Sequence, residues 1–278
     1  MVVDSVTIST AGSIAFLSEN EFLTITETIG LGSTMLTIRD FLAFRAVKTA
    51  NAQAAADGFG AEHLFCTQED VKLKLEGHFN RKIKTLRVIS QEKSDVVITF
   101  EEGAEVRAQL KNFSGEALTS HQTNRRSLAH LPPAWQGIAS HVCLAQPKSR
   151  GRMKGVTRQE FLTPCVLPSA EDGRELARLV LLGTDPAWAP DVMVLTWTSG
   201  GVITKFSVKP MSEYLACVDA AMYATPEIRP TTVSICPEIA MQRKGGDKGN
   251  ESADDLQFKL NFSKDVMDRH AFRIICVG

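Results

Sequence analysis

The chain has 278 residues, and its 31 Lys and Arg against 32 Asp and Glu give a formal net charge of −1. With 44% hydrophobic and 23% charged residues, the composition is that of a folded globular protein, which excludes a disordered, fibrous or uniformly basic chain. The first residues lack the basic segment of a signal peptide, and no apolar run approaches the roughly 18 residues of a membrane span, so we expect a cytoplasmic protein without a membrane partner.

The near-neutral charge does not exclude a nucleic-acid enzyme, because attraction of a charged ligand depends on where the charges are concentrated. The six cysteines never occur as Cys-x-x-Cys or at zinc-finger spacing. In a chain of this length that pattern indicates free thiols in a reducing compartment.

The N-terminal part of the sequence predicts strands followed by two helices. Residues 5–30 alternate apolar and polar side chains with many Thr and Ile, which favours short strands. A helical pattern with a glycine at its end then covers residues 37–58. A second helix is expected over about 61–79, with Thr67 and Asp70 as a capping box within it.

Three strands are expected next, at Lys84–Ser90, Ser94–Phe100 and Glu105–Asn112. The segment Glu101-Glu102-Gly103 separates the last two, and a glycine at its third position suits a three-residue hairpin loop.

The middle of the chain predicts two helices and a basic loop. Polar residues 116–130 are expected to form a helix that ends before two prolines. Residues 147–158 hold five basic and no acidic side chains and are expected to be an exposed loop. Ser169 and Asp172 form a capping box for a helix that ends at Gly183.

The last third of the chain is predicted to be rich in strands. A hairpin of Asp191–Trp197 and Val202–Val208 is followed by a helix at about 211–223. Four further strands are expected, at Thr231–Cys236, Ile239–Arg243, Leu256–Phe262 and Ala271–Val277.

Together these elements predict a single α/β or α+β unit over residues 1–278. A mixed central sheet flanked by helices, with additional hairpins, would have its core in about 37–135. The β-rich part at about 185–278 is a candidate for DNA recognition.

The hairpin at 94–112 carries the candidate chemistry. Side chains alternate between the two faces of a strand, so a loop at 101–103 places Asp95 opposite Gln109, and Lys111 follows on the same face. Oxygen ligands suit Mg²⁺, which activates an attacking water and offsets charge on a phosphate. The lysine adds a positive group beside the developing charge. The pattern indicates metal-assisted phosphodiester cleavage, although an amphipathic hairpin with a solvated outer face would give the same residues.

The order of helix, strand, Asp-bearing strand and x-x-Lys hairpin resembles the core of the PD-(D/E)xK nuclease superfamily, which includes most type II restriction endonucleases and the Mrr-like nucleases. The resemblance covers about residues 58–130 and implies a restriction-endonuclease-like fold. It implies catalytic roles for Glu62, Asp95, Gln109 and Lys111, with Mg²⁺ held by the first three. Asp95 follows Ser94 where the family commonly has proline, and Gln109 replaces an acidic residue, as in Mrr-like members with Gln-x-Lys.

A second hairpin offers an alternative catalytic site. Pro190-Asp191 is followed by Ser207-Val-Lys209 across a Gly-Gly turn. This second hairpin therefore also has Pro-Asp on its first strand and x-x-Lys on its second. Its apolar surroundings favour a buried sheet, and no acidic residue stands 12 or 13 positions after Lys209.

Several basic and amide side chains are candidates for DNA contacts. The segment after strand 239–243 is basic and glycine-rich, which suits phosphate binding. Amides and amines on strand 256–262 alternate with apolar residues and can contact base edges. The predicted DNA-binding residues are Arg125, Arg126, Arg243, Lys244, Lys248, Gln257 and Lys259. A solvated loop and a half-buried strand explain the last five equally well. The basic segment 147–158 and the polar residues His121, Gln122 and Asn124 are further candidates for phosphate contacts.

The sequence contains no P-loop, dinucleotide-binding fingerprint or Gly-x-Ser-x-Gly motif. The leading hypothesis is therefore a Mg²⁺-dependent endonuclease that cuts double-stranded DNA at a specific site, acting as a homodimer. The alternatives are an Mrr-like or anti-phage effector nuclease of low specificity, and a DNA-binding protein without catalytic activity.

Overall fold

A computed structural model describes residues 26–28, 33–35, 60–89, 93–144, 166–229, 232–243 and 255–278. The chain divides into two compact units, Met1–Phe59 and Gly60–Gly278. In the first unit, β1 (Thr26–Thr28) and β2 (Ser33–Met35) form an antiparallel pair; β1 lies within residues 5–30, where strands were expected, and β2 lies just after them. The predicted helix at 37–58 and the basic loop at 147–158 lie outside the described residues.

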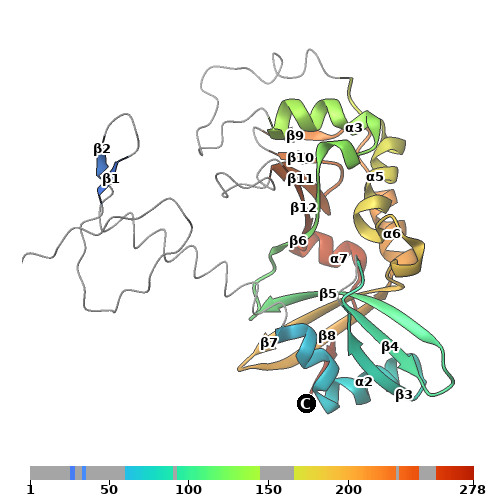
Figure 1. Ribbon diagram of the computed structural model, residues 1–278. Helices are drawn as coiled ribbons and strands as arrows, with labels where there is room; N and C mark the ends of the chain where they lie inside the picture. Colours follow the sequence, from blue (N-terminus) through green and yellow to red (C-terminus); the bar gives the residue numbers. More distant parts are fainter. Residues whose placement is uncertain are drawn as a thin grey trace, which may run out of the picture. The chain divides into compact units, whose positions relative to one another are not determined.

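The second unit contains a six-stranded mixed sheet in the order β13-β8-β7-β5-β4-β3 (Figure 1). Neighbouring strands are antiparallel except for β5 and β7, which run parallel. Its strands are β3 (Ile83–Val88), β4 (Val96–Phe100), β5 (Glu105–Ser114), β7 (Val192–Ser199), β8 (Val202–Pro210) and β13 (Ile275–Cys276).

One face of this sheet packs on the helices that precede it. Residues 60–67 are helical, and α2 (Glu69–Phe79) follows after Gln68. The buried side chains of Phe65 and Leu75 belong to the same apolar cluster as Ile98 and Leu110 of the sheet. This packing fixes the helical residues 60–67 against the strands that carry the predicted site.

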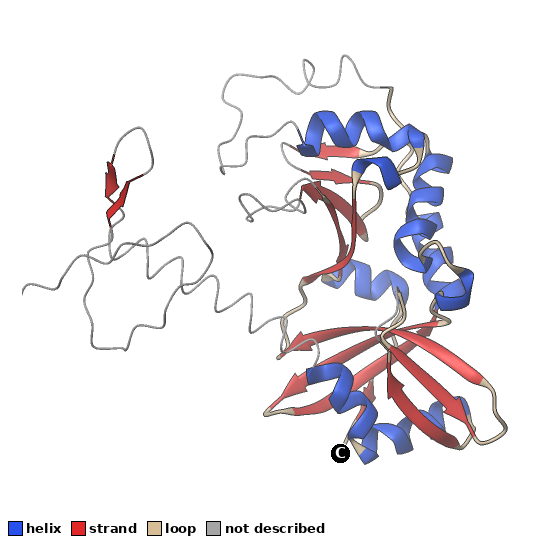
Figure 2. Ribbon diagram, viewed as in Figure 1, coloured by secondary structure: helices blue, strands red, loops and turns tan. Residues whose placement is uncertain are grey.

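A second sheet has five antiparallel strands in the order β6-β12-β11-β10-β9. These are β6 (Ser120–Arg126), β9 (Glu227–Arg229), β10 (Thr232–Ser234), β11 (Ile239–Arg243) and β12 (Leu256–Asn261). Figure 2 shows helices along one side of this sheet. They are α3 (Pro133–Ile138), which continues into a π-helical turn at Ala139–Leu144, α5 (Ala170–Leu182) and α6 (Met211–Ala220), with α7 (Lys264–His270) after β12. Short 3-10 turns occur at Leu128–His130 and Pro186–Trp188.

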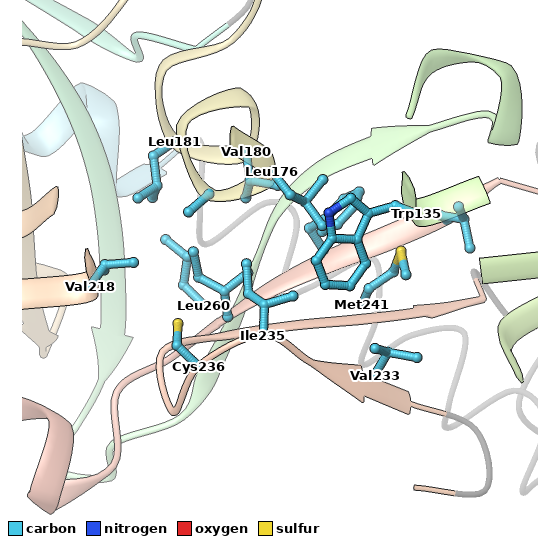
Figure 3. Packing of buried hydrophobic residues seen from close by; sticks show 14 of the residues in the cluster. Trp135, Leu176, Val180, Leu181, Val218, Val233, Ile235, Cys236, Met241 and Leu260 are labelled. Atoms are coloured by element: carbon cyan, nitrogen blue, oxygen red, sulfur yellow. The ribbon is translucent and has the colours of Figure 1, made fainter. Parts of the chain in front are cut away.

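A large apolar core joins the two sheets. Trp135 of α3 and Leu176 of α5 lie among side chains of the five-stranded sheet, including Met241 and Leu260 (Figure 3). The same cluster contains Trp197 of β7, on the other face of the six-stranded sheet. Both faces of β7 are thus buried, as expected for a strand with a parallel neighbour.

The predicted fold class is confirmed, since the structure is a mixed α+β protein with helices on a mixed sheet and additional antiparallel strands. The capping box is also confirmed: Ser169 Oγ accepts from the Asp172 N–H, and the Asp172 carboxylate accepts from the Ser169 N–H at 2.7 Å. The prediction of a single domain over 1–278 with its core at 37–135 stays a prediction, because residues 37–59 are not described.

Three predictions about elements are wrong. Residues 116–130 are not a helix, because Ser120–Arg126 pairs with β12 as an edge strand, and this tertiary pairing overrides their polar composition.

Thr67 and Asp70 do not form a capping box, since α2 begins after Gln68. The side chain of Gln68 bonds both backbone groups of Ile203, at 3.0 and 2.9 Å, which breaks the expected helix in two. The strand expected from Ala271 begins only at Ile275, after the unpredicted helix α7.

Among the described residues, no helix combines the length and apolar character that a membrane crossing requires. The five cysteines that the structure describes are all unpaired, and two of them, Cys143 and Cys236, are buried.

Candidate active site

The β4–β5 hairpin has the predicted three-residue loop. The N–H of Phe100 donates to the carbonyl of Ala104 at 2.9 Å, and Gly103 takes a φ of +89°, which favours glycine. Val96 pairs with Ala108, and the N–H of Asp95 donates to the carbonyl of Ala108 at 2.8 Å. The hairpin therefore brings Asp95, just before β4, beside Gln109 and Lys111 of β5.

The carboxylate of Asp95 is held by β5. Its Oδ2 accepts from the N–H of Leu110 at 2.6 Å and lies 3.9 Å from Lys111 Nζ. Lys111 also donates to the carbonyl of Leu110 at 3.0 Å, and its side chain is only 11% exposed. An ammonium group that is largely shielded from water keeps a strong electrostatic effect on its neighbours.

Glu62, on the helical residues 60–67, faces the same two charges. Burial and the negative charge of Asp95 raise the pKa of Glu62 to about 7, while Lys111 acts in the opposite direction. The side chains of Ala61 and Phe65 are buried on either side of Glu62 in the sequence and anchor this helix on the sheet. The structure thus brings Glu62, Asp95 and Lys111 together.

Gln109 is almost fully buried, with 2% of its surface exposed. Its Nε2 donates to Thr123 Oγ1 at 3.2 Å, whereas its Oε1 has no hydrogen-bond partner. A buried carbonyl oxygen without a donor is costly, and a bound cation would compensate it. The donor set of Glu62, Asp95 and Gln109 consists of oxygens only, which fits a hard cation such as Mg²⁺. Within the described residues, no three His, Cys, Asp or Glu side chains gather closely enough to hold a metal ion.

Two residues that sequence reasoning did not assign to the site lie beside it. The Nζ of Lys93, a residue that is 4% exposed, donates to the carbonyl of Thr123 at 3.1 Å. Thr123 belongs to β6, the segment predicted to be a helix, so no strand periodicity pointed to it. The sequence offers no local signal for contacts between two different sheets.

His121 also belongs to this region, but not as a positive charge. Burial and the charge of Lys111 lower the pKa of His121 to about 4, so the ring is neutral at neutral pH. It packs edge-on against Phe113 with ring centres 4.8 Å apart and contacts Thr119 Oγ1 at 3.2 Å. These contacts fix the ring beside Phe113, and the phosphate contact considered from the sequence stays a prediction.

The groups of the second hairpin bond to separate partners. Asp191 Oδ2 accepts from the N–H of Arg107 at 2.7 Å. Lys209 Nζ donates to the carbonyl of His270 at 2.9 Å and to Glu213 at 3.4 Å. Ser207 is fully buried. The structure does not join Asp191 and Lys209 in the way that it joins Asp95 and Lys111.

Those residues predicted to bind DNA that the structure describes lie on strands of the five-stranded sheet. On β12, Leu256, Phe258 and Leu260 are buried, whereas Gln257 and Lys259 are partly exposed on the opposite face. Arg125 and Arg126 end β6, and Arg243 ends β11. The side chain of Arg126 is partly buried, and Lys244 and Lys248 lie outside the described residues.

Gln257 belongs to a row of three amides that crosses the sheet. Gln242 Nε2 of β11 donates to Gln257 Oε1 at 3.5 Å, and Gln257 Nε2 donates to Gln122 Oε1 of β6 at 2.6 Å. These mutual bonds hold the three side chains side by side on the polar face of the sheet.

The fold and the site together define an α+β protein with an Asp–Lys pair, a glutamate and an unpaired amide oxygen beside the contact between two sheets. No protein-family profile matches the chain, and no curated protein matches it. Among solved structures, the chain is similar to restriction endonuclease MspI in complex with its cognate DNA, at 13% sequence identity and a TM-score of 0.37. The similarity covers 69% of this chain and 78% of that chain.

Proposed function

We propose that the protein is a Mg²⁺-dependent endonuclease of the type II restriction enzyme kind, which hydrolyses phosphodiester bonds of double-stranded DNA at a specific site. The observation that carries this proposal is the unpaired, buried Oε1 of Gln109, a residue that lies opposite Asp95 in the hairpin holding the Asp95–Lys111 pair. Most buried amide oxygens accept a hydrogen bond, so an oxygen without a donor is available to a metal ion.

Asp95, Gln109 and Glu62 would hold the metal. The N–H of Leu110 binds one oxygen of Asp95 and thereby fixes the orientation of the whole carboxylate. When bound, Mg²⁺ lowers the pKa of an attacking water and offsets the charge that develops on the phosphate. In the metal-free protein Glu62 is half protonated near pH 7, since burial and Asp95 raise its pKa to about 7, and it must lose that proton to hold the metal.

Lys111 places a positive charge beside the scissile phosphate. Its ammonium is held by the carbonyl of Leu110 and by Asp95, so its position is set before a substrate binds. A preoriented charge stabilises the transition state without reorganisation. His121, whose pKa is lowered by burial and by Lys111, is neutral at neutral pH and adds no further positive charge.

The amide row supports recognition of a DNA sequence. Glutamine can donate and accept at the same time and pairs with the major-groove edge of adenine. Gln122, Gln242 and Gln257 present such groups from three neighbouring strands, with Lys259 next to Gln257 on β12. Two copies of the chain would place two such sites on the two strands of a symmetric sequence, so we expect a homodimer.

The central experiment compares two pairs of substitutions. Asp95→Asn and Lys111→Met should each abolish Mg²⁺-dependent plasmid cleavage, while Ca²⁺-supported DNA binding and the melting temperature stay close to those of the wild type. Asparagine keeps an oxygen that can accept from the N–H of Leu110, so the hairpin should persist. Asp191→Asn and Lys209→Met are the matched controls and should cut normally. Loss of cleavage in the controls alone would move the site to the second hairpin.

The cleavage pattern distinguishes the remaining functions. Discrete fragments from a long duplex would support the restriction enzyme, and a smear would support an effector nuclease of low specificity. DNA binding without any cleavage by the wild-type protein, over a range of divalent metals, would contradict the enzyme and leave a DNA-binding protein.

A further inference from the structure

Gln68 interrupts a helix that the local sequence would continue. Residues 60–67 are helical, and α2 follows directly after Gln68. Gln68 itself has an extended backbone, with a φ of −77° and a ψ of 113°, although its N–H still donates to the carbonyl of Leu64 at 2.9 Å. Residues 61–76 contain no glycine or proline, and glutamine is a good helix former. The cause of the break must therefore lie outside these helices.

The side chain of Gln68 is bound to strand β8. Its Nε2 donates to the carbonyl of Ile203 at 3.0 Å, and its Oε1 accepts from the N–H of Ile203 at 2.9 Å. A backbone carbonyl can only accept and a backbone N–H can only donate, so these two partners fix the orientation of the amide. The two hydrogen bonds hold residue 68 at one point of the six-stranded sheet.

The helical residues 60–67 run across the sheet from this point. Phe65 is buried and packs edge-on against Phe206 of β8, with ring centres 6.1 Å apart. At the far end, Ala61 is buried in the same apolar cluster, and Glu62 faces the charges of Asp95 and Lys111. Strand β7 lies between β8 and β5, which carries Lys111. The helix thus connects the attachment of Gln68 on β8 with the candidate site.

The length of this helix makes the position of Glu62 sensitive to the break. Glu62 is six residues before Gln68, which is about 9 Å along the axis of an α-helix. A change of about 20° in the direction of the helix at Gln68 would move Glu62 by about 3 Å. A helix that ran straight through residue 68 would have such a different direction relative to α2.

We propose that Gln68 is a positioning residue, whose double hydrogen bond to Ile203 keeps the helix broken and thereby directs Glu62 toward the cation bound by Asp95. This inference rests on the proposed metal site. A residue that adopts a conformation against its local preference, because a distant strand holds it there, is expected beside a functional site.

The test measures Mn²⁺ affinity of the full chain without DNA, from the paramagnetic resonance signal of free Mn²⁺. Gln68→Met keeps the length and the helix propensity of the side chain but loses both hydrogen bonds. Its affinity should fall about tenfold, as is typical when a metal ligand loses its support. Gln136→Met is the matched control, because Gln136 of α3 also donates to a backbone carbonyl, that of Leu131, at 3.0 Å. The control should bind within about twofold of the wild type.

A second substitution retains part of the contact. Gln68→Glu keeps an acceptor for the N–H of Ile203 but loses the donor to its carbonyl, so its affinity should lie between those of the wild type and Gln68→Met. The melting temperature of each variant shows whether it folds, and Gln68→Glu takes over the comparison if Gln68→Met does not.

A second background separates positioning from general damage to the fold. Glu62→Ala removes the ligand that Gln68 would position, and it should weaken Mn²⁺ binding by itself. Gln68→Met should then leave the remaining affinity of Glu62→Ala nearly unchanged, although it weakens that of the wild type. An equal loss in both backgrounds would overturn the positioning role.

The outcomes also separate this inference from the proposed function. Equal Mn²⁺ affinity of the wild type and Gln68→Met, with binding that still depends on Asp95, would reject the role of Gln68 alone. Binding that depends on Asp95 but not on Glu62 would reject it as well. Wild-type binding that Asp95→Asn does not weaken would reject the metal site itself, and the role of Gln68 with it.

Discussion

Glu62 is the side chain of the site whose charge changes within the neutral range. Burial and Asp95 raise its pKa to about 7, against the effect of Lys111. The free protein then carries a half-protonated Glu62 at pH 7, and a cation must displace that proton in order to bind. The affinity for Mn²⁺ should therefore rise between pH 6 and pH 8 and level off above that range.

The comparison for this prediction is Glu62→Gln, which cannot titrate and should have a flatter pH profile. A rise in pH should lower the stability of the metal-free protein, whereas it should raise the affinity for Mn²⁺. A carboxyl group whose pKa is raised on folding favours the folded state below its ordinary pKa, and this contribution is lost as the pH rises through 7. Without metal, the melting temperature of the wild type should fall from pH 5 to pH 8 more than that of Glu62→Gln. Parallel curves would show that Glu62 is not the titrating group.

Gln109→Glu tests whether the side chain at position 109 is a metal ligand, because it replaces the amide with a carboxylate. A carboxylate adds a negative charge beside Asp95, which should tighten Mn²⁺ binding and raise the pKa of Glu62 further. We expect plasmid cleavage to persist, with a changed preference among divalent metals and an optimum at higher pH. Gln109→Leu, of similar size but without an oxygen, should lose Mn²⁺ affinity, and unaltered affinity in that variant would exclude Gln109 as a ligand.

The position of Asp95 beside Gln109 and Lys111 could be predicted because it depends only on counting residues along one hairpin. The contacts of Lys93, Thr123 and His121 could not. Thr123 contacts Gln109 through a bulge that shifts the register between β6 and β12, and no local pattern marks such a shift. His121 loses its charge through burial and through Lys111, ten positions away in the sequence.

At the scale of elements, the loop of the β4–β5 hairpin sets the register on which the site depends. Gly103 has a φ of +89°, so Gly103→Ala should destabilise the protein by about 1 kcal/mol even though the added Cβ would meet no atom within 4 Å. Gly77 lies inside α2, and Gly77→Ala should instead stabilise it by about 0.5 kcal/mol. Urea unfolding of the two variants measures both changes, and shifts of equal sign would contradict the prediction.

Elements defined by local sequence were predicted well, and elements defined by distant partners were not. The capping box at Ser169 and the hairpin loop at 101–103 involve residues three or four positions apart. In contrast, the break at Gln68 depends on Ile203, and strand β6 depends on β12, more than 100 residues further along the chain. Their local composition is polar in both cases and gives no hint of these partners.

At the scale of the whole molecule, the proposed DNA contact makes a prediction about salt. Replacing Arg243, Lys244 and Lys248 together with alanine should flatten the slope of log K against log salt by roughly 0.9 for each phosphate that is no longer neutralised. Affinity should fall equally for specific and random duplexes, because phosphates carry no sequence information. Lys264→Ala, at an exposed lysine of α7, is the control and should leave the slope unchanged. An unchanged slope in the triple variant would favour the basic segment 147–158.

The apolar core that joins the two sheets determines how cooperatively the protein unfolds. Trp197 lies on the six-stranded sheet and Trp135 packs on the five-stranded one, yet both belong to one buried cluster. Neither sheet can expose its inner face without exposing the other, so Gly60–Gly278 should unfold as one cooperative unit. Two variants, one with Trp135 and one with Trp197 as its only tryptophan, should lose their fluorescence signal at the same urea concentration. Separate midpoints would mean that the sheet carrying the proposed catalytic groups and the sheet proposed to face DNA can melt independently.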